Sequence, residues 1–216
     1  FVEKHTDREP YTRVYSKKYK DERDIAVALL IDVSGSTGES VDEDKVLEIE
    51  KKAALIMAEG LGILGDKFGI FGFSGSGRDN CRYYIYKDFR EDWGSEQKEL
   101  LYNATPDSST RIGVAIRHSV RKLEDIEAKT RLIIIITDGK PQDTDGYSSN
   151  DLYAHYDVRK ASLEAQQEGM VVFGLSTENN SLNELDIMFP GNRYQVIKDI
   201  SKLPQLMADF YLRITV

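Results

Sequence analysis

Two uninterrupted runs of apolar residues stand out along the chain, and each run stops close to an aspartate. The first covers residues 25–31 and is followed by Asp32, and the second covers residues 132–136 and is followed by Thr137 and Asp138. A continuous run of valine, isoleucine and leucine is typical of a strand buried on both faces, as in the middle of a parallel sheet. The pattern therefore predicts two central strands, over residues 25–33 and 132–137.

Shorter apolar segments and helical periodicities alternate along the rest of the chain. They predict further strands over residues 68–73, 82–86, 171–175 and 194–197, and helices over residues 42–59, 95–103, 110–127, 156–168, 182–188 and 203–213. This alternation predicts an α/β fold: a doubly wound, Rossmann-like and mostly parallel six-stranded sheet with helices on both faces. A short loop rich in glycine and serine joins the strands at 68 and 82, which predicts one antiparallel edge strand.

Three glycines, Gly60, Gly62 and Gly65, match the spacing G-x-G-x-x-G of dinucleotide-binding loops. That motif needs a strand before it and a helix after it, so that amides at the start of the helix meet the pyrophosphate. In this chain the glycines follow a predicted helix and precede a predicted strand. We therefore expect them to cap the helix and not to bind a dinucleotide.

Oxygen-bearing side chains gather just after both central strands. Asp32, Ser34 and Ser36 follow the first strand, Asp138 follows the second, and Thr110 opens the helix over 110–127 in a loop of hydroxyls. Ligands of open α/β sheets bind at the carboxyl ends of the strands, and hard oxygen donors suit Mg²⁺, Mn²⁺ or Ca²⁺. A second interpretation stays open, because serine, threonine and aspartate at such turns also cap helices.

These five residues, in this order and on these elements, resemble the metal-ion-dependent adhesion site of a von Willebrand factor A domain. The resemblance covers residues 24–216. It implies that Ser34 and Ser36 coordinate a cation directly, Thr110 directly or through water, and Asp32 and Asp138 mainly through water. It also implies Mg²⁺, Mn²⁺ or Ca²⁺ as the ion, an open coordination position for a glutamate or aspartate of a protein partner, and no catalysis.

Other segments are similar to the A domain at the carboxyl end of NorD-type proteins. They are residues 71–74, 77–78, 110–118, 137–145 and 156–161. This resemblance implies work beside a MoxR-class AAA+ ATPase, in the activation of a metalloenzyme such as nitric oxide reductase. It also makes Asp157 and Arg159 candidates for partner contacts. Loops that follow the predicted strands add Arg78, Asp143 and Asp145, and the two aspartates are also candidates for orienting the metal ligands.

Four of the five partner-contact candidates have an ordinary structural alternative. Asp143 and Asp145 stand beside Gly146 and could begin turns, which is a common role for aspartate. Asp157 could be an acid near a helix N-terminus, and Arg159 a solvated base. These alternatives stay open.

The main enzymatic alternative is a metal-dependent phosphotransferase or phosphatase on a Rossmann-like fold, which also places an aspartate after the first strand. That class needs a second aspartate two residues later, where this chain has Ser34. A hydroxyl there removes the acid that would protonate the leaving group. Neither Ser34 nor Ser36 lies in G-x-S-x-G, the motif of serine hydrolases. We therefore expect a binding module and not an enzyme.

The composition indicates which classes of partner and which cellular location to expect. The chain has 29 lysines and arginines against 37 aspartates and glutamates, a net charge of −8, which disfavours nucleic acid as a partner. Its single cysteine, Cys81, cannot form an internal disulfide, which fits a reducing, cytoplasmic location. No apolar stretch approaches the roughly 20 residues of a membrane span.

The length of 216 residues fits one domain. Residues 1–23 are polar and lack periodicity, so we expect a leader or linker there and the domain over 24–216. Because the chain begins with phenylalanine, we expect it to be a piece of a longer protein.

Overall fold

The computed structural model describes residues 24–35, 40–41, 44–77, 79–107, 109–137, 141, 152–176, 182–191 and 193–197. The expected leader over 1–23 and the expected helix over 203–213 lie outside these residues. None of the described helices is both long enough and apolar enough to cross a membrane.

Six strands form the main sheet. In sequence they are β1 (Ile25–Asp32), β4 (Lys67–Ser76), β5 (Asn80–Lys87), β6 (Thr130–Thr137), β7 (Met170–Ser176) and β8 (Tyr194–Val196). Their order across the sheet is β5-β4-β1-β6-β7-β8, and all neighbours pair in parallel except β4 and β5. The prediction of a mostly parallel six-stranded sheet with one antiparallel edge strand is confirmed.

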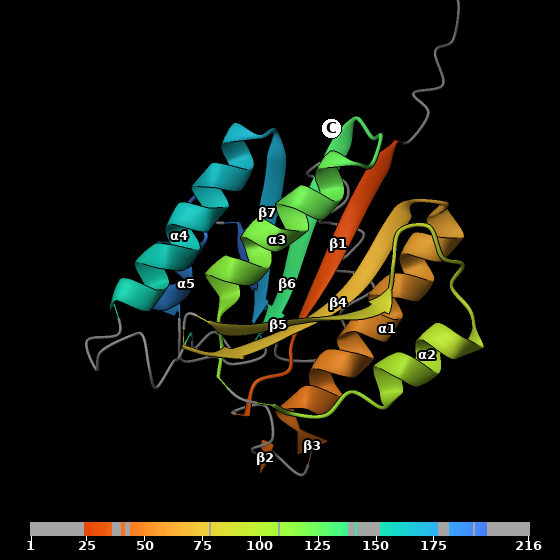
Figure 1. The fold of residues 1–216 in the computed structure, drawn as a ribbon, viewed down its shortest axis with the longest axis horizontal. Coiled ribbons are helices and arrows are strands. Elements are labelled where there is room, and N and C mark those ends of the chain that lie inside the picture. The colour runs from red at the N-terminus through yellow and green to blue at the C-terminus, as the bar shows by residue number, and fades with distance from the viewer. Residues whose placement is uncertain are drawn as a thin grey trace, which may run out of the picture.

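Within the described ranges, five helices pack on this sheet: α1 (Val46–Leu64), α2 (Ser95–Tyr102), α3 (Ile112–Glu124), α4 (Leu152–Gln167) and α5 (Leu182–Met188). Figure 1 shows α1 and α2 together on one side of the sheet and α3, α4 and α5 on the other. The predicted doubly wound architecture is therefore confirmed.

The central strand β1 explains why a continuous apolar run is needed at this place. Its residues 25, 27, 29 and 31 belong to the core beneath α1 and α2, whereas 26, 28 and 30 belong to the core beneath α3, α4 and α5. Every residue of β1 is buried, and residues 132–136 of β6 repeat the alternation. Both faces of these strands exclude water, so residues 25–31 and 132–136 are all apolar.

Three helix boundaries differ by four or more residues from those that the sequence predicts. One is the end of α1, which lies at Leu64 and not at residue 59. Helix α1 begins at Val46 and not at residue 42, because residues 40–45 contain a small antiparallel ladder of β2 (Ser40–Val41) and β3 (Asp44–Lys45). Helix α4 begins at Leu152 and not at residue 156. Its first turn carries Leu152 and Tyr153 exposed to solvent, 58% and 61% respectively, so the pattern of buried positions gives no signal there.

The end of α1 shows what the three glycines do. Gly60 and Gly62 lie inside the helix, whereas Gly65 follows its last residue with a φ of 74°. The amide of Gly65 donates to the carbonyl of Gly62 (3.2 Å), and the amide of Asp66 donates to the carbonyl of Leu61 (3.1 Å). This pattern is a Schellman motif, so the expectation of a glycine cap is correct for Gly65.

We expect Gly62→Ala and Gly65→Ala to change stability in opposite directions. An alanine at 65 would be forced into the left-handed region and should lower the free energy of unfolding by about 1 kcal/mol. At 62 the nearest atom to a new methyl group is 4.0 Å away, so alanine should raise the free energy of unfolding by about 0.5–1 kcal/mol. Urea unfolding of both variants tests this, and a loss at both positions would contradict it.

Candidate functional site

Asp32 lies at the carboxyl end of β1 with its side chain fully buried. One carboxylate oxygen, Oδ1, accepts a hydrogen bond from the amide of Ser34 (2.9 Å), and the other, Oδ2, accepts one from the hydroxyl of Thr137 (3.0 Å). The second bond joins residues 105 positions apart in sequence. The carboxylate is thus held in a fixed orientation from both sides.

The strand order places this carboxylate at a topological switch point. From β1 the chain passes through α1 to β4 on one side of β1, and only later forms β6 on the other side. The crevice between β1 and β6 is where ligands of open α/β sheets bind. Asp32 and Thr137 lie at the ends of these two neighbouring strands and continue the positions that face α3 and α4.

Thr110 reaches the same edge of the sheet from the segment before α3. The amide of Asp107 donates to the carbonyl of Val33 (2.7 Å), and Ser109 exchanges two backbone hydrogen bonds of 2.8 Å with Gly75. Thr110 follows directly and is buried, as is Ser34. The structure therefore brings Asp32, Ser34 and Thr110 to one sheet edge, whereas Ser36 and Asp138 lie outside the described residues.

The described donors fit a hard divalent cation. Asp32 and the hydroxyls of Ser34 and Thr110 offer oxygen atoms, which Mg²⁺, Mn²⁺ and Ca²⁺ prefer. Burying a carboxylate costs free energy unless it is hydrogen-bonded, and the amide of Ser34 and the hydroxyl of Thr137 both bind Asp32. Among the described residues no three histidines, cysteines or acids cluster as a metal site, so a site here depends on hydroxyls.

Two residues with a role at this edge were not assigned from the sequence. Thr137 orients Asp32, and its only signal is that it ends the second apolar run directly before Asp138. Asp107 binds the end of β1 through its amide and contacts β5 through its side chain, where the hydroxyl of Tyr84 donates to it (2.6 Å). It opens the hydroxyl-rich run before Thr110, but a local pattern cannot show that its partners lie on another strand.

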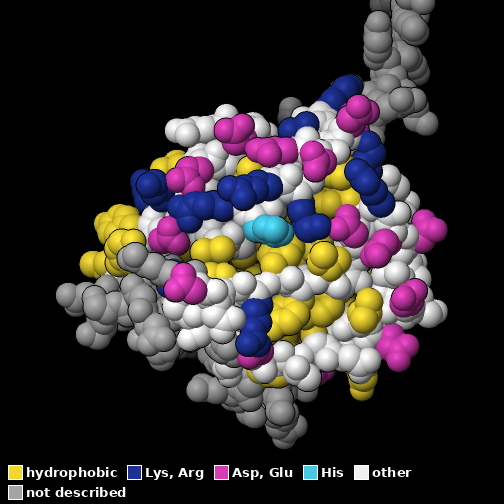
Figure 2. Space-filling view, in the orientation of Figure 1, with side chains coloured by type: hydrophobic (Ala, Val, Ile, Leu, Met, Phe, Trp, Pro, Cys, Tyr) yellow, Lys and Arg dark blue, Asp and Glu magenta, His cyan; other side chains and the backbone are white. Residues whose placement is uncertain are grey.

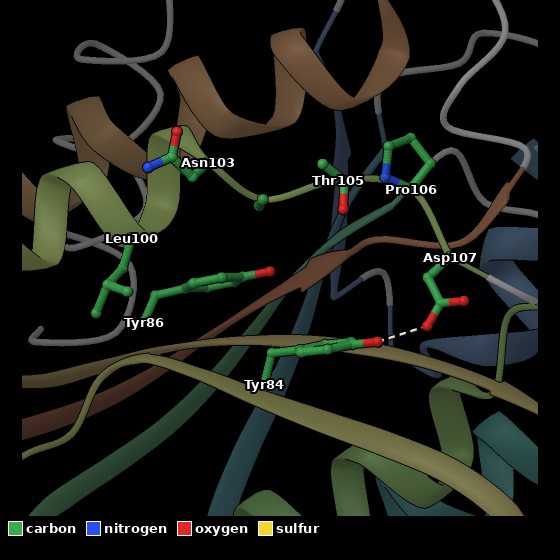
Figure 3. Close-up of a pocket in the computed structure, with 8 residues that line it drawn as sticks. Tyr84, Tyr86, Leu100, Asn103, Thr105, Pro106 and Asp107 are labelled. Atoms are coloured by element: carbon green, nitrogen blue, oxygen red, sulfur yellow. Dashed lines mark hydrogen bonds between the residues drawn. The ribbon is translucent and has the colours of Figure 1, made fainter.

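A pocket adjoins this edge between β5, α2 and the segment after α2. It has a volume of about 430 Å³. Figure 3 shows the rings of Tyr84 and Tyr86 along the pocket, with their hydroxyls directed toward the segment that carries Thr105 and Asp107. Burial raises the pKa of Tyr86, so this phenol stays neutral. The lining residues are Tyr84, Tyr86, Leu100, Asn103, Ala104, Thr105, Pro106 and Asp107.

Two of the candidate partner-contact residues lie in α4, and their contacts are within the fold. Asp157 accepts a hydrogen bond from Arg117 of α3 (3.0 Å), and a methyl group at Gly113 would lie 2.2 Å from its carboxylate. Arg159 donates to the carbonyl of Ile187 in α5, at 3.4 Å. Both contacts join helices on the same face of the sheet. The other three candidates, Arg78, Asp143 and Asp145, lie outside the described residues.

We expect Asp157→Asn to weaken the packing of α3 on α4. Arg117 also binds Glu164 (2.6 Å), so it would keep one acidic partner. Because its side chain is partly exposed, at 35%, the loss should be about 1 kcal/mol or less of unfolding free energy. Urea unfolding measures this, with Lys160→Ala on the exposed side of α4 as a control that should stay within about 0.5 kcal/mol. Equal stability of Asp157→Asn and wild type would contradict the packing role.

Positive and negative side chains are mixed on the face of the molecule that carries α3 and α4. Figure 2 shows lysine and arginine side chains in a band over α3 and α4, with aspartates and glutamates around them. Several are paired: Lys122 lies 2.8 Å from Asp88, and Arg117 binds Asp157 and Glu164. Burial raises the pKa of Asp88, but the hydrogen bond and charge of Lys122 outweigh burial, so the pKa lies below its usual value. The band is therefore largely neutralised by its own acidic neighbours.

Proteins of similar sequence share this domain. The chain is 34% identical over 199 residues to Protein NorD of Brucella suis, an alignment that covers 92% of the chain and 31% of that protein. It is 32% identical to Protein NorD of Stutzerimonas stutzeri, with 86% of the chain and 30% of that protein covered. The chain thus spans about a third of the length of these relatives.

Solved structures of low sequence identity share the fold. The PilB minor pilin from Streptococcus sanguinis matches with a TM-score of 0.67 and 18% identity over 92% of this chain and 63% of that one. The vWF domain of the type V pili tip protein Mfa5 from Porphyromonas gingivalis matches with a TM-score of 0.65 and 9% identity over 89% and 97%. The family model for the von Willebrand factor type A domain matches residues 26–209. The chain therefore belongs to the von Willebrand factor type A domain family.

Proposed function

We propose that this chain is a metal-dependent protein-binding module, in which a divalent cation at the end of β1 binds a carboxylate of a partner protein. The observation that carries the proposal is the fully buried Asp32, held by Ser34 and Thr137 at the switch point of the sheet. An oriented, buried carboxylate beside hydroxyls offers the oxygen ligands that a hard cation prefers. The preferred ion is Mg²⁺, with Mn²⁺ or Ca²⁺ as substitutes.

The residues have distinct roles in this proposal. Ser34 and Thr110 hold the ion through their hydroxyls, and Asp32 fixes the first of these by accepting the amide of Ser34. Ser36 and Asp138 complete the set by their resemblance to the adhesion site. When bound, the cation supplies an electrophilic position for a glutamate or aspartate of the partner. With few direct carboxylates in the set, the ion keeps enough charge to attract that ligand.

We further propose that the module belongs to a NorD-like accessory protein. In that setting it works with a MoxR-class AAA+ ATPase to activate or assemble a metalloenzyme such as nitric oxide reductase, in the cytoplasm. The similarity to proteins named NorD supports this setting. A module that only binds fits such a role, because the ATPase would supply the energy and this domain the attachment.

Capture from an extract of the native organism tests both parts. Immobilised wild-type chain and Asp32→Ala are each incubated with Mg²⁺ or with EDTA, and bound proteins are identified by mass spectrometry. We expect an AAA+ ATPase or a metalloenzyme only with wild type and Mg²⁺. Asp125→Ala is the matched control, because this exposed aspartate follows α3 at the opposite edge of the sheet.

The outcomes separate the alternatives. Equal recovery in all four conditions would overturn the metal-bridge proposal. Metal-dependent recovery of other proteins alone would keep the bridge and overturn the NorD-like setting. Asp32-dependent hydrolysis of an aryl phosphate would instead favour the phosphotransferase.

A further inference from the structure

The segment between α2 and α3 is fastened to the sheet at two points of its backbone. Asp107 donates its amide to Val33, one residue before Ser34. Ser109 forms a two-bond antiparallel bridge with Gly75, near the end of β4. Thr110 is the next residue, so the position of its hydroxyl follows from how this short stretch is held.

The side chain of Asp107 adds a third attachment, to the edge strand β5. Its Oδ2 atom accepts the hydroxyl of Tyr84 at 2.6 Å, as Figure 3 shows, and pairs with the guanidinium of Arg82. The hydroxyl of Ser74 of β4 lies 3.5 Å from the same oxygen. A hydrogen bond to a charged group is stronger than one between neutral groups, so the Tyr84 contact is well suited to hold the segment.

The close approach of this segment also depends on Gly75. A methyl group there would lie 3.1 Å from the carbonyl oxygen of Asn80 and 3.3 Å from the side chain of Arg111. Both contacts are tighter than ordinary van der Waals distances. Glycine at position 75 therefore lets β5 and the side chain of Arg111 lie close to β4.

We propose that Asp107 is a positioning residue for the metal site, and that Tyr84 and Arg82 of the edge strand act through it to place Thr110. The inference rests on the proposed function, since it assigns Thr110 to the cation. Residues that orient metal ligands without touching the metal commonly change its affinity about 10- to 100-fold when they are altered. Asp107 orients its ligand through three residues of backbone, so its effect belongs at the lower end of that range.

A titration of the 216-residue chain with Mn²⁺ tests the proposal. Electron paramagnetic resonance measures the concentration of free Mn²⁺ and so gives the dissociation constant. We expect Asp107→Ala to raise the Mn²⁺ dissociation constant about 10-fold. Tyr84→Phe, which removes one hydrogen bond, should raise it about 3-fold. Asp107→Asn keeps an acceptor for the Tyr84 hydroxyl and should recover most of the loss.

Tyr86→Phe is the matched control for Tyr84→Phe. Tyr86 lies two residues along β5 and lines the same pocket, but its hydroxyl is not the one that binds Asp107. The Tyr86→Phe variant should bind Mn²⁺ with the affinity of wild type. The melting temperature of each metal-free variant is measured alongside. If Tyr84 only stabilises the fold, Tyr84→Phe should lower the melting temperature and bind Mn²⁺ as tightly as Tyr86→Phe does.

The failures of the two proposals differ. If wild type and Asp32→Ala both fail to bind Mn²⁺ at millimolar concentration, the proposed metal site is wrong, and the role of Asp107 falls with it. If wild type binds and Asp32→Ala does not, but Asp107→Ala and Tyr84→Phe bind as tightly as wild type, only the positioning role is overturned.

Discussion

Adding Mg²⁺ is expected to raise the melting temperature of the wild-type chain and to leave that of Asp32→Ala unchanged. A ligand at 100 times its dissociation constant stabilises the folded state by about 2.7 kcal/mol if the unfolded chain does not bind it. For a domain of this size, 1 kcal/mol corresponds to roughly 2–4 °C. The wild-type shift should therefore be about 5–10 °C, measured by differential scanning calorimetry.

The comparison needs two controls. EDTA should return the wild-type melting temperature to its metal-free value, and Asp125→Ala should show the full shift. Asp32→Ala in the absence of metal gives the separate effect of losing the contacts to Ser34 and Thr137. A shift of the same size in Asp32→Ala and wild type would show that the ion binds elsewhere.

Phe71→Ala is expected to cause the largest loss of stability, about 3–5 kcal/mol of unfolding free energy. Phe71 of β4 is fully buried, with its ring centroid 5.1 Å from that of Tyr83 and 5.8 Å from that of Phe89. It also packs so closely that a methyl group on Gly69 would lie 2.5 Å from the ring. Removing the ring leaves a cavity that β4, paired on both sides, cannot close by moving.

Ile63→Ala is the control for this loss. Ile63 lies near the end of α1 and is 85% exposed, so its truncation should change the free energy of unfolding by about 0.5 kcal/mol or less. Urea unfolding gives both values on one scale. A loss below about 1 kcal/mol for Phe71→Ala would mean that the core around β4 relaxes to fill the space.

Most of the fold could be predicted from the sequence because its central strands are buried on both faces. Residues 25–31 and 132–136 are all apolar, although the chain as a whole is rich in charge. Such short continuous apolar runs are typical of strands in the middle of a parallel sheet. The edge strand β5 was predicted from a turn rich in glycine and serine. Its antiparallel pairing with β4 confirms that local turn chemistry carries topological information.

The boundaries that were wrong lie where local signals are weak. The ladder of β2 and β3 has two residues in each strand, which is too short for any periodicity. The first two residues of α4, Leu152 and Tyr153, are exposed, so these apolar side chains do not mark a buried face. Contacts between distant parts of the chain decide where the β2–β3 ladder forms and where α4 begins. The local pattern of apolar and polar residues does not contain this information.

The candidate site divides in the same way. The sequence predicted Asp32 and Ser34 after the first central strand and Thr110 at the start of a helix, and the structure brings all three to one edge of the sheet. Their role as metal ligands stays a prediction. The parts that could not be predicted are the partnerships between distant segments, Thr137 with Asp32 and Asp107 with β5, because these depend on which strands become neighbours.

The hydrogen bond from Thr137 to Asp32 has a consequence for how the protein is made. A ribosome must synthesise the 105 residues that separate them before the carboxylate gains its second partner. Until β6 emerges, β1 has one unpaired edge, and its sequence IAVALLID is apolar and β-prone enough to aggregate. Pairing of β6 with β1 therefore covers the second edge of β1 and gives Asp32 its hydrogen bond from Thr137 in the same step.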